Sequence, residues 1–173
     1  KDQKLKITSS VGGLATGMKS VHAEGDAIWI GWSGIPNEEL DPSMSLQVDE
    51  AIRKQKCISV PLSAEDVEQY YEGFSNKALW PLFHYFMEYS RFEQEEWEAY
   101  KRVNQKFADV ILDHIEDGDT VWIHDYQLLL LPKMIKDIRP DVTIGFFLHI
   151  PFPSFEIFRI FPWRIELLEG MLG

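Results

Sequence analysis

Short apolar segments alternate along this sequence with longer segments of helical periodicity, and this alternation is the feature that most restricts the fold. Most of the short segments are apolar at successive positions, which predicts strands covered on both faces. Strands are expected at 27–32, 57–60, 121–123 and 143–148, with a half-exposed strand at 4–7. Strands of this kind, joined by helices, are typical of an α/β fold, in which helices cover both faces of a parallel sheet.

Capping signals and apolar spacing locate the expected helices. Two pairs have the spacing of a capping box: Ser63 with Asp66, and Ser90 with Glu93. The first pair is expected to open a helix that Gly73 ends, and the second to open a long amphipathic helix reaching Ile111. The polar, proline-containing segment 37–45 is expected to be a loop. Further helices are expected at 131–138, after Ser154, and from Pro162 onward.

Composition restricts the class of protein and its partners. The 173 residues are 45% hydrophobic, which is enough for a real core and excludes global disorder. The formal net charge of −11 disfavours nucleic acid and anionic membranes as partners. The longest apolar run, 144–152, is too short to span a membrane, and no signal peptide is apparent.

Cysteine and histidine usage leads to two further expectations. The single cysteine, Cys57, leaves no internal disulfide and favours a reducing, cytoplasmic compartment. The five histidines lack metal-binding spacing, so no metal or other cofactor is expected. The chain has no initiator Met and stops directly after a helical pattern, so both ends look cut.

Polar residues that directly follow strands are the first candidates for a site, because ligands bind beyond the carboxyl ends of parallel strands. These residues are Ser33, His124, Asp125, Tyr126 and His149. Asp125 could accept hydrogen bonds from a sugar and Tyr126 could donate one to a phosphate. Alternatively, His124 or Asp125 caps the next helix and Tyr126 packs. His149 is either a satisfied core histidine or a functional group held rigidly by the prolines after it.

Two other segments carry weaker signals. Gly12-Gly13, where a loop enters a helix, could hold a phosphate through backbone amides, or could be an ordinary turn. An aromatic cluster is expected to be mostly core, although aromatic rings with hydroxyls also bind sugars, and Asn76 and Lys77 lie near enough to add polar contacts. Its members are Tyr70, Tyr71, Trp80, Phe83, His84 and Tyr85.

Several segments, taken together and in order, resemble the trehalose-6-phosphate synthase family. They are GGLATG (12–17), WIGWSG (29–34), YYEGFSNKALWPLFHY (70–85), VN..FA (103–108), WIHDYQLLLLP (122–132) and IGFFLHIPFPS.EIFR.FPWR.ELLEG (144–170). The resemblance implies a retaining glucosyltransferase of the two-Rossmann-domain (GT-B) class. It implies that glucose passes from UDP-glucose to glucose 6-phosphate, and that the sheet is Rossmann-like.

The resemblance also implies roles for individual residues. Gly12 and Gly13 would meet the diphosphate of the donor through their amides. The acceptor would be surrounded by Trp32, Tyr71, Trp80, Asp125 and Tyr126. His149 would contact the donor glucose beside the reacting carbon, orient it and stabilise developing charge, since no nucleophilic carboxylate is evident.

Departures from the family pattern concern the two ends. The family's first strand, with an Asn-Arg pair that holds the acceptor phosphate, would lie before Lys1, and the second Rossmann domain would follow Gly173. Residues 1–173 are therefore expected to be a partial N-terminal, acceptor-side domain, inactive alone, whose open sheet could favour strand exchange or a homo-oligomer. Two alternatives stay open: a relative that uses glycerol 3-phosphate as acceptor, and a non-catalytic sensor of sugar phosphates.

Overall fold

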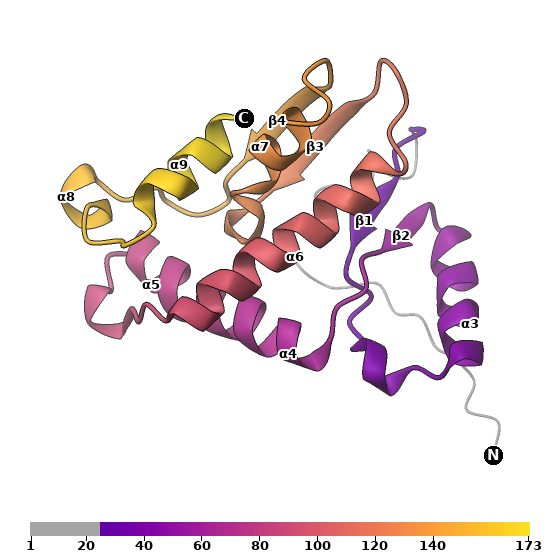
Figure 1. Cartoon of the computed structure of the whole chain (residues 1–173), viewed down its shortest axis with the longest axis horizontal. Coiled ribbons are helices and arrows are strands. Elements are labelled where there is room, and N and C mark those ends of the chain that lie inside the picture. Colours follow the sequence, from indigo (N-terminus) through magenta and orange to yellow (C-terminus); the bar gives the residue numbers. More distant parts are fainter. Residues whose placement is uncertain (1–24) are drawn as a thin grey trace. The chain divides into compact units, whose positions relative to one another are not determined.

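The structure, a computed structural model, describes residues 25–173 (Figure 1). The chain divides into two compact units, Lys1–Pro61 and Leu62–Gly173, which are described in turn. No helix within 25–173 is both long and apolar enough to cross a membrane. The strands in each unit pair in parallel, and helices connect them, which confirms the α/β class predicted from the alternating pattern.

The first unit contains a parallel strand pair joined by a helix. Strand β1 (Trp29–Gly31) pairs with β2 (Cys57–Ser59), and Trp29 lies opposite Cys57. Between them lie a 3-10 turn, η1 (Asn37–Glu39), and helix α3 (Pro42–Arg53). The expected loop at 37–45 is therefore wrong over its second half. Asp41 begins the helix, because its side chain accepts hydrogen bonds from two backbone amides of the first turn and Pro42 suits the first helical position.

The second unit begins with a helical stretch whose start was predicted and whose end was not. Ser63 and Asp66 form the expected capping box ahead of α4 (Ala64–Asp66). The chain then continues through the π-helical segment η2 (Val67–Leu79) and α5 (Trp80–Phe83), followed by the 3-10 turn η3 (Met87–Tyr89). Gly73 does not end the helix. A Cβ at Gly73 would lie 2.7 Å from Cδ of Glu96, so this glycine allows a close approach to the next helix.

Helix α6 (Gln94–Leu112) is the long amphipathic helix expected from the apolar spacing, and it buries Trp97, Tyr100 and Val103 on one face. The second capping box is wrong. Glu93 occupies the N-cap position without a side-chain hydrogen bond to the helix. Ser90 lies within the preceding turn, where its amide bonds to the carbonyl of Met87 and its hydroxyl is buried without a partner.

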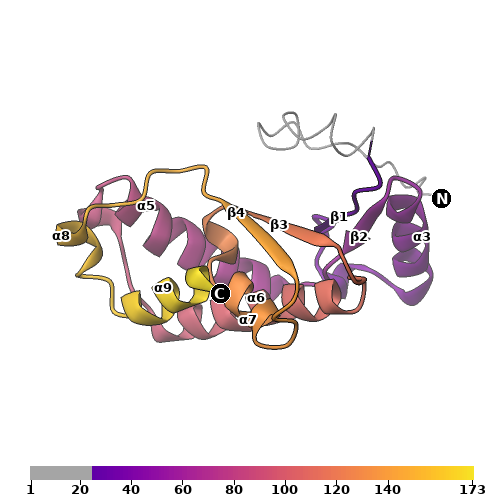
Figure 2. The ribbon, with the colours of Figure 1, turned by 90° about the horizontal axis from the view of Figure 1, so that it is seen from above.

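Two strands with short helices complete the second unit. Strand β3 (Thr120–His124) pairs with β4 (Thr143–Phe147), so that His124 lies opposite Phe147. The 3-10 turn η4 (Tyr126–Leu128) and helix α7 (Leu131–Lys136) connect them. Helices α8 (Phe155–Phe158) and α9 (Arg164–Leu172) follow. Figures 1 and 2 show α6 and α7 on one side of the β3–β4 pair. Trp122 and Phe147 are each 51% exposed, so these two strands are not buried on both faces.

An aromatic cluster forms the core between η2, α6 and the segment that leads into α9. Phe74 is fully buried, and its ring lies within 6 Å of the rings of Trp97, Tyr100, Phe161 and Trp163. Burial of this much aromatic surface stabilises the unit and fixes the position of η2, which carries the predicted site residue Tyr71.

Candidate active site

The carboxyl ends of β3 and β4 are joined by the side chain and backbone of Asp125. Its amide donates to the carbonyl of Phe147 at 2.8 Å. Its Oδ1 accepts from the amide of Tyr126 at 3.0 Å and from the amide of His149 at 3.3 Å. Asp125 therefore caps the turn after β3, which was one of the two roles expected from the sequence. It also holds the loop after β4 beside this turn.

Asp125 has an unusual backbone conformation, with φ 73° and ψ 172°. Glycine adopts this region almost exclusively, and for another residue it costs of order 1–3 kcal/mol. Hydrogen bonds on both sides of Asp125 hold it there. Backbone strain of this kind is concentrated at functional sites, which supports a role for Asp125 beyond capping.

A buried tyrosine fixes the turn that follows Asp125. The hydroxyl of Tyr100, on α6, donates to the carbonyl of Tyr126 at 2.7 Å and accepts from the amide of Leu129 at 3.0 Å. Asn104, one helical turn later, donates its side-chain amide to the carbonyl of Gln127. Side chains of α6 thus provide hydrogen-bond partners for backbone groups of η4 and of Leu129, so the position of Tyr126 depends on α6.

The side chain of Tyr126 reaches from this turn to η2. Its hydroxyl donates to Oδ1 of Asn76 at 2.9 Å, and its ring is buried. Burial, followed by the nearby Tyr71 and Asp125, raises the pKa of Tyr126 well above its ordinary value. Tyr126 is therefore a neutral hydrogen-bond donor at physiological pH, and Tyr71 lies close enough to influence it.

The aromatic cluster of the sequence divides into core and exposed members. Tyr70 and Phe83 are buried, whereas Tyr71 and Trp80 are 43% and 41% exposed. Trp80 stacks on His84, with ring centroids 4.1 Å apart. The structure thus brings Tyr71 to the Asp125–Tyr126 group, and gives Trp80 its ring contact with His84 instead.

His149 is exposed, so it is not a satisfied core histidine. Its Nε2 lies 3.1 Å from Nδ1 of His124, at the end of β3. Burial, followed by His149, lowers the pKa of His124, while Asp125 acts in the opposite direction. The sequence placed His124 among the residues that follow a strand, but gave no indication that it would contact His149.

Three predicted residues do not belong to the described part of the second unit. Gly12 and Gly13 are outside the described residues. Trp32 belongs to the first unit, where its indole Nε1 donates to the carbonyl of Ile35 at 3.3 Å. Among residues 25–173, no group of three or more His, Cys, Asp or Glu side chains is arranged to hold a metal ion.

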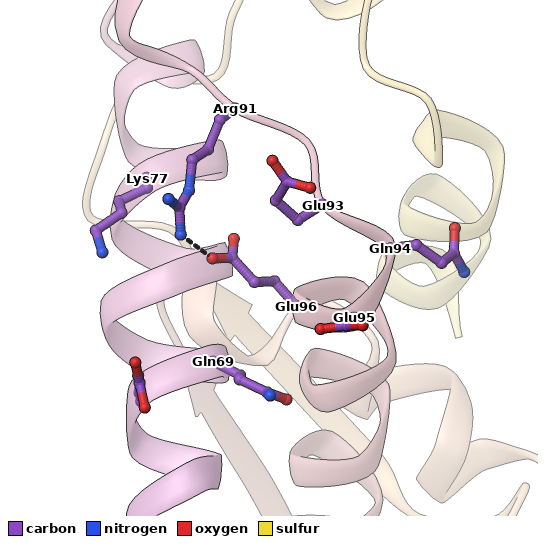
Figure 3. A pocket seen from close by; sticks show the side chains of 8 residues that line it. Gln69, Lys77, Arg91, Glu93, Gln94, Glu95 and Glu96 are labelled. Atoms are coloured by element: carbon purple, nitrogen blue, oxygen red, sulfur yellow. Dashed lines mark hydrogen bonds and ion pairs between the residues drawn. The ribbon is translucent and has the colours of Figure 1, made fainter.

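A polar pocket of about 520 Å³ lies apart from these residues, between η2 and the start of α6 (Figure 3). It is lined by Glu68, Gln69, Lys77, Arg91, Glu93, Gln94, Glu95 and Glu96. Arg91 reaches across it to pair with Oε1 of Glu96, and Oε2 of Glu96 is buried without a partner. Lys77, which was expected to add polar contacts near the aromatic cluster, is among the residues that line this pocket.

Comparison with known proteins connects this geometry with a family. Residues 1–173 match the family described as glycosyltransferase family 20. The chain is 48% identical to the trehalose-6-phosphate synthase of Mycolicibacterium gilvum, over 99% of this chain and 34% of that protein.

Two solved structures are also similar. One is an α,α-trehalose-phosphate synthase (UDP-forming) from Burkholderia xenovorans in complex with glucose-6-phosphate, with a TM-score of 0.78, 31% identity, and coverage of 96% of this chain and 36% of that one. The other is an E. coli structure bound with UDP-2-fluoro glucose, with a TM-score of 0.77, 36% identity, and coverage of 96% and 36%. The chain spans about a third of the length of these relatives. It belongs to glycosyltransferase family 20, as its motifs had indicated.

Proposed function

We propose that the protein containing this chain transfers glucose from UDP-glucose to glucose 6-phosphate, with retention at the anomeric carbon, to give trehalose 6-phosphate. The observation that carries the proposal is the meeting of Asp125, Tyr126 and His149 at the carboxyl ends of β3 and β4. A relative named trehalose-6-phosphate synthase, and neighbours bound with glucose-6-phosphate or UDP-2-fluoro glucose, support it.

The acceptor side of the proposed site is a set of hydroxyl, carboxylate and aromatic groups. Asp125 accepts hydrogen bonds from sugar hydroxyls, and the neutral Tyr126 hydroxyl, whose proton is donated to Asn76, accepts one. Tyr71 and Trp80 supply exposed ring surface for the C–H faces of the sugar, with Trp32 completing the set. None of these side chains is cationic, so the phosphate of glucose 6-phosphate is held by groups outside this set.

The donor side is built around His149, with Gly12 and Gly13 meeting the diphosphate. As the bond from the anomeric carbon to UDP breaks, positive charge develops on the sugar and negative charge on the leaving diphosphate. His149 orients the donor glucose and stabilises this developing charge. The reaction needs neither a metal nor another cofactor in this proposal, and takes place in the cytoplasm. The partners are small-molecule substrates rather than nucleic acid or membrane, and a homo-oligomer is compatible with it.

The test uses the complete protein that contains the chain. We would mix it with UDP-glucose and glucose 6-phosphate, and follow UDP release and the anomeric configuration of the product. His149→Ala is expected to reduce turnover by at least about 100-fold, whereas His114→Ala, a change of an exposed histidine in the turn after α6, should leave it unchanged.

Each other outcome identifies an alternative. UDP release only with glycerol 3-phosphate would show that the acceptor is glycerol 3-phosphate rather than glucose 6-phosphate, while the class of reaction, glucosyl transfer, would stand. Binding of sugar phosphates without turnover of any acceptor would contradict the proposal and favour the sensor.

A further inference from the structure

Four rings form a row on one face of the β3–β4 pair. Trp122 and His124 are two residues apart on β3 and so share a face, and His124 lies opposite Phe147, the last residue of β4. His149 follows two residues after the end of β4, and its ring contacts those of His124 and Phe147. Neighbouring ring centroids along the row lie 4.8 Å (Trp122–His124), 5.3 Å (His124–His149) and 4.6 Å (Phe147–His149) apart. The imidazole of His149 thus lies between the rings of His124 and Phe147 in this row.

His149 is exposed, and an exposed imidazole ordinarily samples several rotamers. Here two contacts restrict it. The ring of Phe147 packs against it, and Nδ1 of His124 lies at hydrogen-bond distance, 3.1 Å, from its Nε2. The backbone of His149 is fixed separately by Oδ1 of Asp125. With Nε2 engaged by His124, Nδ1 is the ring nitrogen of His149 that remains for a ligand.

We propose that His124 is a positioning residue for His149: its hydrogen bond fixes the ring orientation and the tautomer of His149, so that Nδ1 meets the donor sugar. The catalytic part of this inference rests on the proposed function. His124 itself need not touch substrate. A hydrogen bond between the two imidazoles requires one donor and one acceptor, so the pair cannot carry two imidazolium charges and keep it. The lowered pKa of His124 agrees with a neutral partner.

Two substitutions separate the hydrogen bond from the ring. His124→Phe keeps a ring in the row and removes the nitrogen. His124→Asn loses the ring but places an amide near the position of Nδ1. In the complete protein with UDP-glucose and glucose 6-phosphate, we expect His124→Phe to lower kcat by about 10- to 100-fold, with KM for both substrates nearly unchanged. His124→Asn should restore most of the lost kcat. His114→Phe, in the exposed turn after α6, is the matched control and should have no effect.

A second measurement does not depend on turnover. In protein labelled with 15N at histidine, the ring-nitrogen shifts of His149 should report a single neutral tautomer in the wild type and a mixture in His124→Phe. A mixture of tautomers in the wild type would overturn the inference. So would a wild-type kcat in His124→Phe, or an equally low kcat in His124→Asn and His124→Phe. An inactive wild-type protein that still shows one tautomer would contradict the proposed function and leave the positioning of His149 supported.

Discussion

At the scale of single residues, Tyr100 illustrates how one buried hydroxyl can fix a site loop. Its hydroxyl donates to the carbonyl of Tyr126 and accepts from the amide of Leu129. Burial keeps the pKa of Tyr100 well above its ordinary value, so the hydroxyl remains a neutral donor. Tyr100→Phe would keep the ring packing and leave both backbone groups buried without partners. We expect a loss of about 1–3 kcal/mol in the free energy of unfolding, measured by urea denaturation.

The control for this change is Tyr89→Phe, because Tyr89 is 71% exposed and its hydroxyl can bond to water. Its free energy of unfolding should equal that of the wild type. Equal stability of Tyr100→Phe and the wild type would mean that water takes over both bonds, and that α6 does not hold η4 through this hydroxyl.

The same residues show what local sequence can reveal. Asp125 and His149 were predictable, because each follows an apolar strand and the ends of parallel strands meet. The contacts of Tyr100 with η4 and of His124 with His149 join positions about 25 residues apart. Tyr100 lies on the buried face of the helix that was expected to be amphipathic, but its hydroxyl bonds depend on how α6 packs. No local pattern encodes such a contact.

At the scale of elements, Asp66, the last residue of α4, links α4 to α6. The carboxylate is 2% exposed, and it accepts from Lys106 at 2.5 Å and from Arg102 at 3.0 Å. Burial alone would raise the pKa of Asp66, but hydrogen bonds from Lys106, Ser63 and Arg102 together lower it below 3.8. The ionised carboxylate therefore stabilises the folded protein above about pH 4, and this contribution is lost as the pH falls through the lowered value.

Asp66→Asn should consequently reduce stability by about 1–3 kcal/mol near neutral pH, with a smaller difference from the wild type in acid. Urea denaturation at about pH 7 and about pH 3 would measure both. Glu72→Gln, a change of an exposed acid on η2, should follow the wild type at each pH. A constant difference between Asp66→Asn and the wild type would show that the cap, rather than the charge, supplies the stability.

Elements were predictable where the signal was local, as at the capping box of Ser63 and Asp66, and along the apolar face of α6. Elements were mispredicted where a residue type occurs both in loops or helix ends and within or at the start of helices. Gly73 often would end a helix, but here it allows a close approach to Glu96. Asp41 with Pro42 resembles a loop and in fact begins α3. Whether such residues interrupt or begin a helix depends on what packs beside them.

At the scale of the whole molecule, the division into two units leads to a prediction about folding. Nearly all of the buried apolar side chains among the described residues lie within 62–173, including the cluster around Phe74. A segment of this size with its own core is expected to fold alone. Residues 62–173 should therefore unfold in one cooperative thermal transition when produced without 1–61.

The stack of Trp97 on Trp163 provides the probe for that transition. The two ring centroids lie 5.2 Å apart with planes inclined by 12°, a fixed geometry that should give a near-ultraviolet circular dichroism band. The band should disappear at the same temperature as the far-ultraviolet helical signal, and Trp97→Phe should remove it while leaving the fold. A helical signal without the band would indicate a loosely packed state. In that case the core around Phe74 would require residues 1–61, and the division into two units would describe geometry without independent folding.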